Sequence, residues 1–128
     1  MRKVARALVG LVGAFNVLLG LGFLIDPAQA GLRFFLLSLG TQGLATMRAD
    51  FTAFFVTGGV FAVVAAWRAW RTPLLVPVSL LGIAISGRAI SLIADGAPGT
   101  AFPPMVVEAL MILILAIGWR HFDAEAAR

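Results

Sequence analysis

The sequence predicts an all-α integral membrane protein, a four-helix bundle with a short interfacial or re-entrant segment between helices one and two. Apolar residues make up 61% of the chain and charged residues 12%, whereas a soluble domain is roughly half apolar and a quarter charged. Four apolar stretches are each long enough to cross a hydrocarbon core about 30 Å thick. Together they use nearly all 128 residues, so we expect a single transmembrane domain, 1–128.

The first span is expected at about residues 4–25. Residues 7–25 carry no charge and would form about 28 Å of helix at 1.5 Å per residue. The basic start and Ala28-Gln29-Ala30 also resemble a cleavable signal peptide, but the apolar stretch exceeds the usual 7–15 residues. We therefore expect an uncleaved helix. Asp26-Pro27 ends it, because a residue before proline disfavours helical geometry.

The segment at about 31–47 is too short in its apolar part to span. That part, 34–39, lies between Arg33 and a polar, glycine-containing stretch at 40–43. Irregular backbone is tolerated at membrane depth only where it packs on protein or meets water. We therefore expect an interfacial or re-entrant segment on the outer side of the membrane.

The three later spans have recognisable ends. The cluster 67–71 combines tryptophan and arginine, which is typical of a cytoplasmic membrane edge. Thr72-Pro73 offers an N-cap and a proline at the first helical position. Residues 96–99 form a loop by composition, and Pro103-Pro104 opens the last helix. The expected spans are about 49–70, 73–95 and 103–121.

Basic residues predict the orientation of the chain. Placing one set of them on a single side satisfies the positive-inside rule for four spans with both termini cytoplasmic. The net charge of +4 is therefore an orientation signal, and the basic residues are not grouped as a nucleic-acid partner would require. The set comprises Arg2, Lys3, Arg6, Arg68, Arg71, Arg120 and Arg128.

Several chemistries are excluded by composition. The chain has no cysteine and one histidine, His121, which removes disulfides, thiolate metal sites and cysteine nucleophiles. It contains no phosphate-binding loop, zinc-hydrolase or serine-elbow motif. We expect no metal and no cofactor.

Arg88 and Glu108 are the strongest functional candidates, because each interrupts a segment otherwise apolar enough for a bilayer. A charge at the centre of a spanning helix costs about 2.5–3.5 kcal/mol on insertion scales and usually faces the protein interior. Counted from the cytoplasmic ends at 1.5 Å per residue, Arg88 lies about 22 Å deep and Glu108 about 18 Å. Asn16 lies about 15 Å deep by the same count. We expect these three side chains to meet.

Further polar residues lie nearer the outer boundary. Asp50 and Asp95 are expected there with Arg48, and Ser91 shares one helix face with Arg88 and Asp95. The interpretation is a polar funnel, with the two aspartates at its mouth and the Arg88–Glu108 pair deeper. Asp50 has a simpler alternative role as an N-cap of the second span.

Glycine and phenylalanine offer weaker signals. Gly10, Gly13, Gly20 and Gly22 in the first span, with Gly58-Gly59 in the second, are predicted to let helices approach closely. The phenylalanines are numerous enough to line a lipid pocket, but we expect most of them to face lipid. They are Phe34, Phe35, Phe51, Phe54, Phe55 and Phe61.

The chain resembles a family of small bacterial membrane proteins classed as a domain of unknown function. The resemblance rests on Asp26-Pro27, on the stretch 44–51 (LATMRADF), on Gly87-Arg88 and on Asp95-Gly96, and it covers the chain to about Gly96. It implies a four-helix protein of the bacterial inner membrane and no established activity. In size and helix count the chain is also similar to the DoxX-like four-helix group.

Three functions are compatible with these residues. The first is binding of a lipid or small apolar ligand, in which Arg88 would bind the polar head and Asn16 would orient it. Glu108 would serve as acid or base if the protein were an enzyme, which the sequence leaves open. The second is an accessory or assembly subunit of a larger complex or a homo-oligomer, in which the charges only hold helices in register. The third is a small transporter.

Overall fold

The computed structural model describes residues 1–124 and contains four long helices, each of a length and composition that can cross a membrane. No strand occurs among these residues; an isolated bridge joins Trp70 and Asp123. The expected all-α four-helix bundle is confirmed, and the chain is a multi-pass membrane protein. The long helices are α1 (Arg2–Ile25), α3 (Gly40–Arg68), α4 (Leu75–Ala94) and α5 (Phe102–His121); the short elements are α2 (Pro27–Leu32), η1 (Thr72–Leu74) and η2 (Gly99–Ala101).

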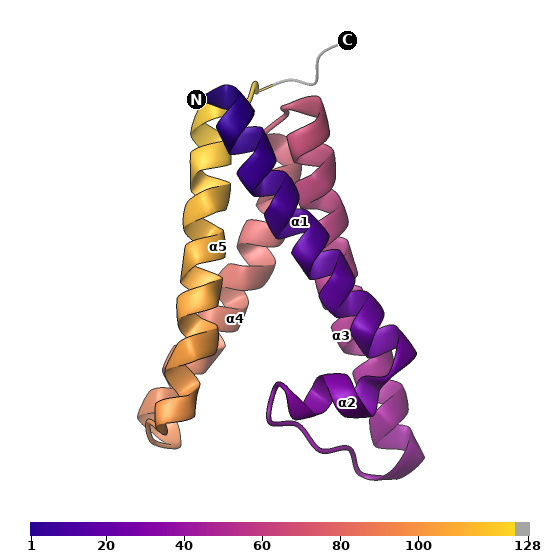
Figure 1. Ribbon diagram of the computed structural model, residues 1–128. Helices are drawn as coiled ribbons and strands as arrows, with labels where there is room; N and C mark the ends of the chain where they lie inside the picture. The colour runs from indigo at the N-terminus through magenta and orange to yellow at the C-terminus, as the bar shows by residue number, and fades with distance from the viewer. Residues whose placement is uncertain (125–128) are drawn as a thin grey trace.

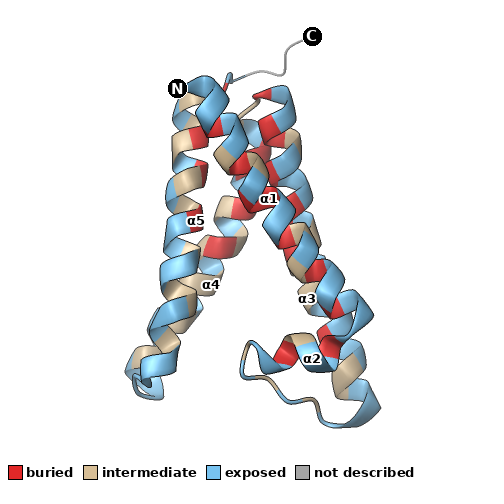
Figure 2. Cartoon of the chain, viewed as in Figure 1, coloured by how far each residue is buried: buried red, intermediate tan, exposed pale blue. Residues whose placement is uncertain are grey.

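The long helices form two arms that meet at one end (Figure 1). One arm consists of α1 packed on α3, and the other consists of α4 and α5. The arms meet at the end where the chain begins and α5 finishes, and they diverge toward the connecting loops, where α2 lies against the first arm. We call these the terminal end and the loop end. Buried residues are concentrated along α1 and α3 and at the terminal end (Figure 2).

Glycines bring α1 and α3 into backbone contact. A Cβ added to Gly59 would lie 2.7 Å from both the Gly13 carbonyl oxygen and the Val17 nitrogen. A Cβ added to Gly13 would lie 2.8 Å from the Val63 nitrogen, and Gly20 is similarly close to α3. The predicted packing role is therefore confirmed at these three glycines. It is wrong for Gly22, beside which a Cβ would meet nothing within 4 Å.

The main hydrophobic core lies at the terminal end. Val9, Leu74 and Leu115 are fully buried there, and they come from α1, η1 and α5. Gly118 permits this approach, because a Cβ at that position would lie 2.7 Å from Val9 and 3.3 Å from Leu74. In a bilayer such contacts stabilise the bundle through close van der Waals packing, because lipid tails are as apolar as leucine and supply no hydrophobic driving force. This core joins the two arms.

A second core, made of aromatic side chains, stabilises the loop end of the first arm. Phe23 of α1 is fully buried, and its ring stacks on Phe51 at 4.7 Å between centroids and on Phe55 at 5.9 Å. Phe34 also packs on Phe23 and Phe55. Phe35 and Phe61 remain exposed. The expectation that most of these phenylalanines face lipid is therefore wrong for the clustered ones, which form a packed core.

The interfacial segment expected at 31–47 is not one unit. Its start belongs to α2, where Asp26 accepts a hydrogen bond from the Gln29 backbone nitrogen at 3.1 Å. Its second half begins α3 at Gly40, whose φ of +61° glycine adopts without strain. Met47 is buried against Gly31 in the aromatic core. The polar stretch 40–43, where irregular backbone was expected, is therefore part of a helix that the burial of Met47 stabilises. Only residues 33–39 connect α2 to α3.

Candidate functional site

The expected ion pair between Arg88 and Glu108 is present and joins α4 to α5. Arg88 Nε donates to Glu108 Oε1 at 3.0 Å. The Arg88 side chain is 37% exposed and that of Glu108 is 12% exposed. Glu108 Oε2 is buried and accepts no hydrogen bond within residues 1–124. An unsatisfied buried acceptor costs about 1–3 kcal/mol. Glu108 Oε2 can therefore still accept a hydrogen bond, with a gain in stability.

A groove of about 520 Å³ lies beside this pair, on the face of α4 that carries Arg88, Ser91 and Asp95. These residues follow the helical spacing i, i+3, i+7 and therefore share that face, as predicted. Small residues keep the groove open: a Cβ at Gly87 or Gly96 would meet nothing within 4 Å. Ala84, Leu92, Pro98 and Ala101 complete the lining. Its volume lies in the range of small-molecule sites, about 300–1,000 Å³.

The wall formed by the α4–α5 connection was missed from sequence. Gly96, Pro98 and Ala101 line the groove, although their composition indicated only a loop. The available signal was the run of glycine, alanine and proline directly after Asp95, because small loop residues leave space next to a helix end.

Asn16 does not join the ion pair, contrary to expectation. It is 6% exposed, and its Nδ2 donates to the Val12 carbonyl at 2.9 Å and contacts Met111 Sδ at 3.4 Å. Met111 follows Glu108 by one turn of α5, so Asn16 reaches the neighbouring turn. The direction in which each side chain points therefore separates Asn16 from the ion pair.

Asp50 and Arg48 also lie apart from the groove. Arg48 Nε donates to the Leu24 carbonyl at 3.0 Å, which attaches α3 to the end of α1. Asp50 is exposed within α3 and makes no hydrogen bond to residues 1–124. It is not an N-cap, since α3 begins at Gly40. The predicted mouth formed by Asp50 and Asp95 is wrong, because α3 and the end of α4 belong to arms that diverge at the loop end (Figure 1).

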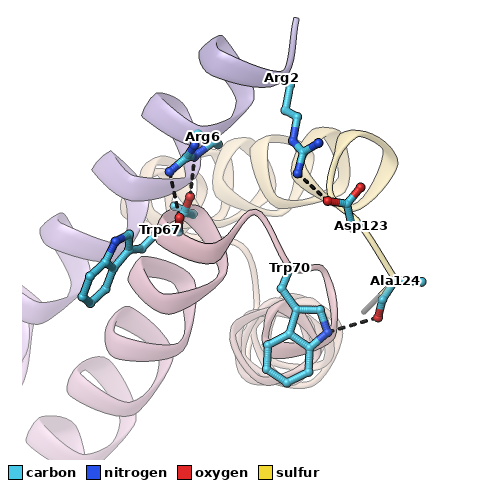
Figure 3. Close-up of polar contacts among 7 residues, drawn as sticks. Arg2, Arg6, Trp67, Trp70, Asp123 and Ala124 are labelled. Carbon is cyan, nitrogen blue, oxygen red and sulfur yellow. Dashed lines mark hydrogen bonds and ion pairs between the residues drawn. The ribbon is translucent and has the colours of Figure 1, made fainter. Parts of the chain in front are cut away.

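Polar contacts close the terminal end (Figure 3). Arg6 of α1 donates to the Ala66 carbonyl at 2.8 Å and to the Trp67 carbonyl at 2.7 Å, at the end of α3. Arg2 pairs with Asp123, and Trp70 Nε1 donates to the Ala124 carbonyl at 3.1 Å. The last carbonyl groups of a helix have no hydrogen-bond partners within it, and they form the negative end of the helix dipole. Arginine supplies both the hydrogen-bond donors and the positive charge that this end favours.

This terminal end carries most of the basic residues predicted to share one side. Arg71, directly before η1, has its guanidinium carbon 5.1 Å from the ring centroid of Trp119 in α5, a cation–π contact. Its backbone nitrogen also donates to the Asp123 carbonyl at 3.0 Å. Arg128 lies outside the described residues. These contacts tie the ends of the four long helices together, so the two arms are joined here.

Residues 1–124 contain no group of three or more histidine, cysteine or carboxylate side chains that could hold a metal ion. No protein-family model matches the chain, and no curated protein or solved structure is significantly similar to it. The family resemblance noted in the sequence therefore stays a prediction. The geometry alone has to support any assignment of function.

Proposed function

We propose that this protein binds a lipid or a small apolar molecule that carries one polar head, and that the head lies at Arg88. One observation carries the proposal: Arg88 lines a groove of about 520 Å³, and its guanidinium uses Nε for Glu108 while its Nη groups donate to no acceptor within residues 1–124. Arginine presents five donors in a planar fork, so most of its donor capacity remains for a ligand.

The position of the groove favours a ligand from the bilayer. Arg88 lies six residues before Ala94, the last residue of α4, which is about 9 Å from the helix end. The groove therefore extends from within the apolar layer to the interface, where lipid head groups lie. A charged residue at this depth is costly unless it is paired, hydrated or bound to a ligand.

We further propose that the protein lies in a bacterial inner membrane with both termini cytoplasmic, which places the groove on the outer side. Support for the orientation comes from the basic residues gathered at the terminal end, as the positive-inside rule requires. Support for the membrane comes from the family resemblance alone.

Native mass spectrometry of protein gently extracted from its own membrane tests the binding proposal. We expect a discrete small-molecule or lipid adduct in the wild type and in Arg33→Gln, a matched control at an exposed arginine in the α2–α3 connection. We expect its loss in Arg88→Gln. Ser91→Leu adds bulk to the lining of the groove and keeps both charges of the ion pair, so it tests binding even if Arg88→Gln folds poorly. Equal adducts in all four proteins would contradict the proposal.

A second candidate, an assembly subunit, is favoured by the exposure of the second arm. Only Pro77 and Leu81 of α4 are buried, so most of its surface is available to lipid or to another protein. In this case the ion pair would hold α4 and α5 in register, at about 0.6–2 kcal/mol. Chemical cross-linking in the native membrane would then join α4 to a partner protein and give a product of one discrete, larger mass. Absence of that product would contradict this alternative.

A further inference from the structure

The groove carries opposite charges in a fixed order along α4. Arg88 lies deepest, the Ser91 hydroxyl follows one turn later, and the Asp95 carboxylate lies at the end of the helix. The seven-residue separation places the backbone positions of Arg88 and Asp95 about 10 Å apart along the helix axis, and both residues line the groove. A ligand in the groove therefore has the positive charge of Arg88 at its deep end and the negative charge of Asp95 at its outer end.

The net charge of the site disfavours a head group that is only anionic. Arg88 is already paired with Glu108, and Asp95 adds a second carboxylate. With both carboxylates ionised, these three side chains sum to one negative charge. A phosphate bound to Arg88 would be repelled by this excess unless the same head group carried a positive charge near Asp95.

Asp95 does not stabilise the end of α4. It is the C-cap of α4, and a carboxylate there faces the negative end of the helix dipole, which is unfavourable. Its side chain is exposed and accepts no hydrogen bond within residues 1–124. A cationic group of a ligand would supply the missing partner.

The chemistry of the lining also distinguishes among cationic heads. Quaternary ammonium groups have no N–H donors and are usually recognised by aromatic cages, but no aromatic residue lines the groove. A primary ammonium can donate to the Asp95 carboxylate and to the Ser91 hydroxyl. The lining therefore fits a primary ammonium better than a choline.

We propose, resting on the function proposed above, that the groove binds a phosphoethanolamine lipid, with its phosphate on Arg88 and its ammonium on Asp95. In a bilayer leaflet the phosphate is attached next to the glycerol and the ammonium extends from it toward water. This order of charges matches the groove, with the cationic side chain deep and the anionic one at the rim. The acyl chains lie along the lipid-exposed surface of the second arm.

The test uses full-length protein in nanodiscs that contain equal amounts of phosphatidylethanolamine and phosphatidylglycerol, with bound lipid measured by native mass spectrometry. We expect the wild type to retain phosphatidylethanolamine preferentially by about 1.4-fold to fivefold, which is the range for one partly exposed charge pair. Asp95→Asn should bring the ratio close to one, because it removes the rim charge and leaves Arg88 in place. Asp50→Asn, which neutralises an exposed carboxylate on α3, should keep the wild-type ratio.

Two further arms identify the ligand. Discs in which phosphatidylcholine replaces phosphatidylglycerol should again show preference for phosphatidylethanolamine, and equal retention would overturn the primary-ammonium assignment. Soluble glycerophosphoethanolamine should fail to displace the bound lipid at equal concentration. Displacement would show that the site takes the free head group, which contradicts a lipid ligand.

Failure of this inference is distinguishable from failure of the proposed function. Retention that Ser91→Leu abolishes, but that shows no preference and no effect of Asp95→Asn, would overturn the phosphoethanolamine assignment and leave binding at Arg88 intact. Retention unaffected by Ser91→Leu and Arg88→Gln would overturn both. Asp95→Asn is suited to this comparison, because its helix-ending contact is made by the backbone nitrogen to the Ser91 carbonyl.

Discussion

The crossing of α1 and α3 gives the sharpest prediction about stability, because two adjacent glycines of α3 differ in what lies beside them. At Gly59 a Cβ would lie 2.7 Å from the backbone of α1, whereas at Gly58 it would lie 3.4 Å from the Leu80 Cδ1 atom, the far end of a flexible side chain. Gly59→Ala must therefore move the helices apart, and Gly58→Ala need not. Both substitutions replace glycine by alanine within α3, so their effects on backbone entropy and helix propensity are alike. The difference in stability between the two variants therefore measures the steric clash alone.

The magnitude follows from the distances. Restoring ordinary contact of 3.4 Å at Gly59 requires a separation of about 0.7 Å, and a gap of about 0.5–1 Å forfeits a quarter to a half of the dispersion energy of the atoms involved. Overpacking of this kind typically costs about 1–3 kcal/mol. The gain in helix propensity from glycine to alanine, about 1 kcal/mol, is common to both variants. We expect Gly59→Ala to be less stable than Gly58→Ala by about 1–3 kcal/mol.

Unfolding by SDS in mixed micelles, followed by loss of helical circular dichroism, measures the difference in free energy. Gly13→Ala should resemble Gly59→Ala, since it meets the same crossing. The double variant should cost less than the sum of the two, because one separation of the helices relieves both clashes. Equal stability of Gly58→Ala and Gly59→Ala would refute the proposed backbone contact.

Three other perturbations have defined outcomes. Reversing either charge of the Arg88–Glu108 pair should destabilise the protein by about 1–3 kcal/mol, and reversing both should restore most of it in the same unfolding assay; no rescue would contradict the contact. Arg6→Gln should lower the free energy of unfolding by about 1–2 kcal/mol, because it removes hydrogen bonds to two carbonyls at the end of α3. Lys3→Gln should leave the free energy of unfolding unchanged. Equal effects of the two substitutions would argue against a stabilising role of the Arg6 hydrogen bonds. Met47→Ala should cost about 2–4 kcal/mol by leaving a cavity in the aromatic core, and unchanged stability would show that this core does not stabilise the loop end.

Composition and charge pattern were enough to predict the class of protein. Apolar stretches of spanning length are separated by prolines, glycines and arginines, and lipid tolerates few backbone structures other than helices. The four spans and the pairing of Arg88 with Glu108 followed from this. Helix boundaries shifted where tertiary contacts decided them, as at Met47, whose burial extends α3 by several residues beyond the expected start.

The site depended on directions that a sequence does not specify. Counting residues placed Asn16 within one layer of the ion pair, but depth along a helix says nothing about which neighbour its side chain faces across the bundle. The divergence of the two arms likewise separates Asp50 from Asp95, although both lie toward the loop end. Helical spacing alone was sufficient for Arg88, Ser91 and Asp95, because residues three, four and seven apart share one face of any helix.

The sequence by itself therefore determined the membrane class, the four helices and the single-face arrangement of charges on α4, because these depend on hydrophobicity and helical periodicity within one segment. Only the tertiary structure decided that Asn16 does not join the ion pair, how closely α1 approaches α3 and that the groove lies between α4 and its following loop. Such features depend on contacts between segments distant in the chain. The packing of small and large side chains sets those contacts.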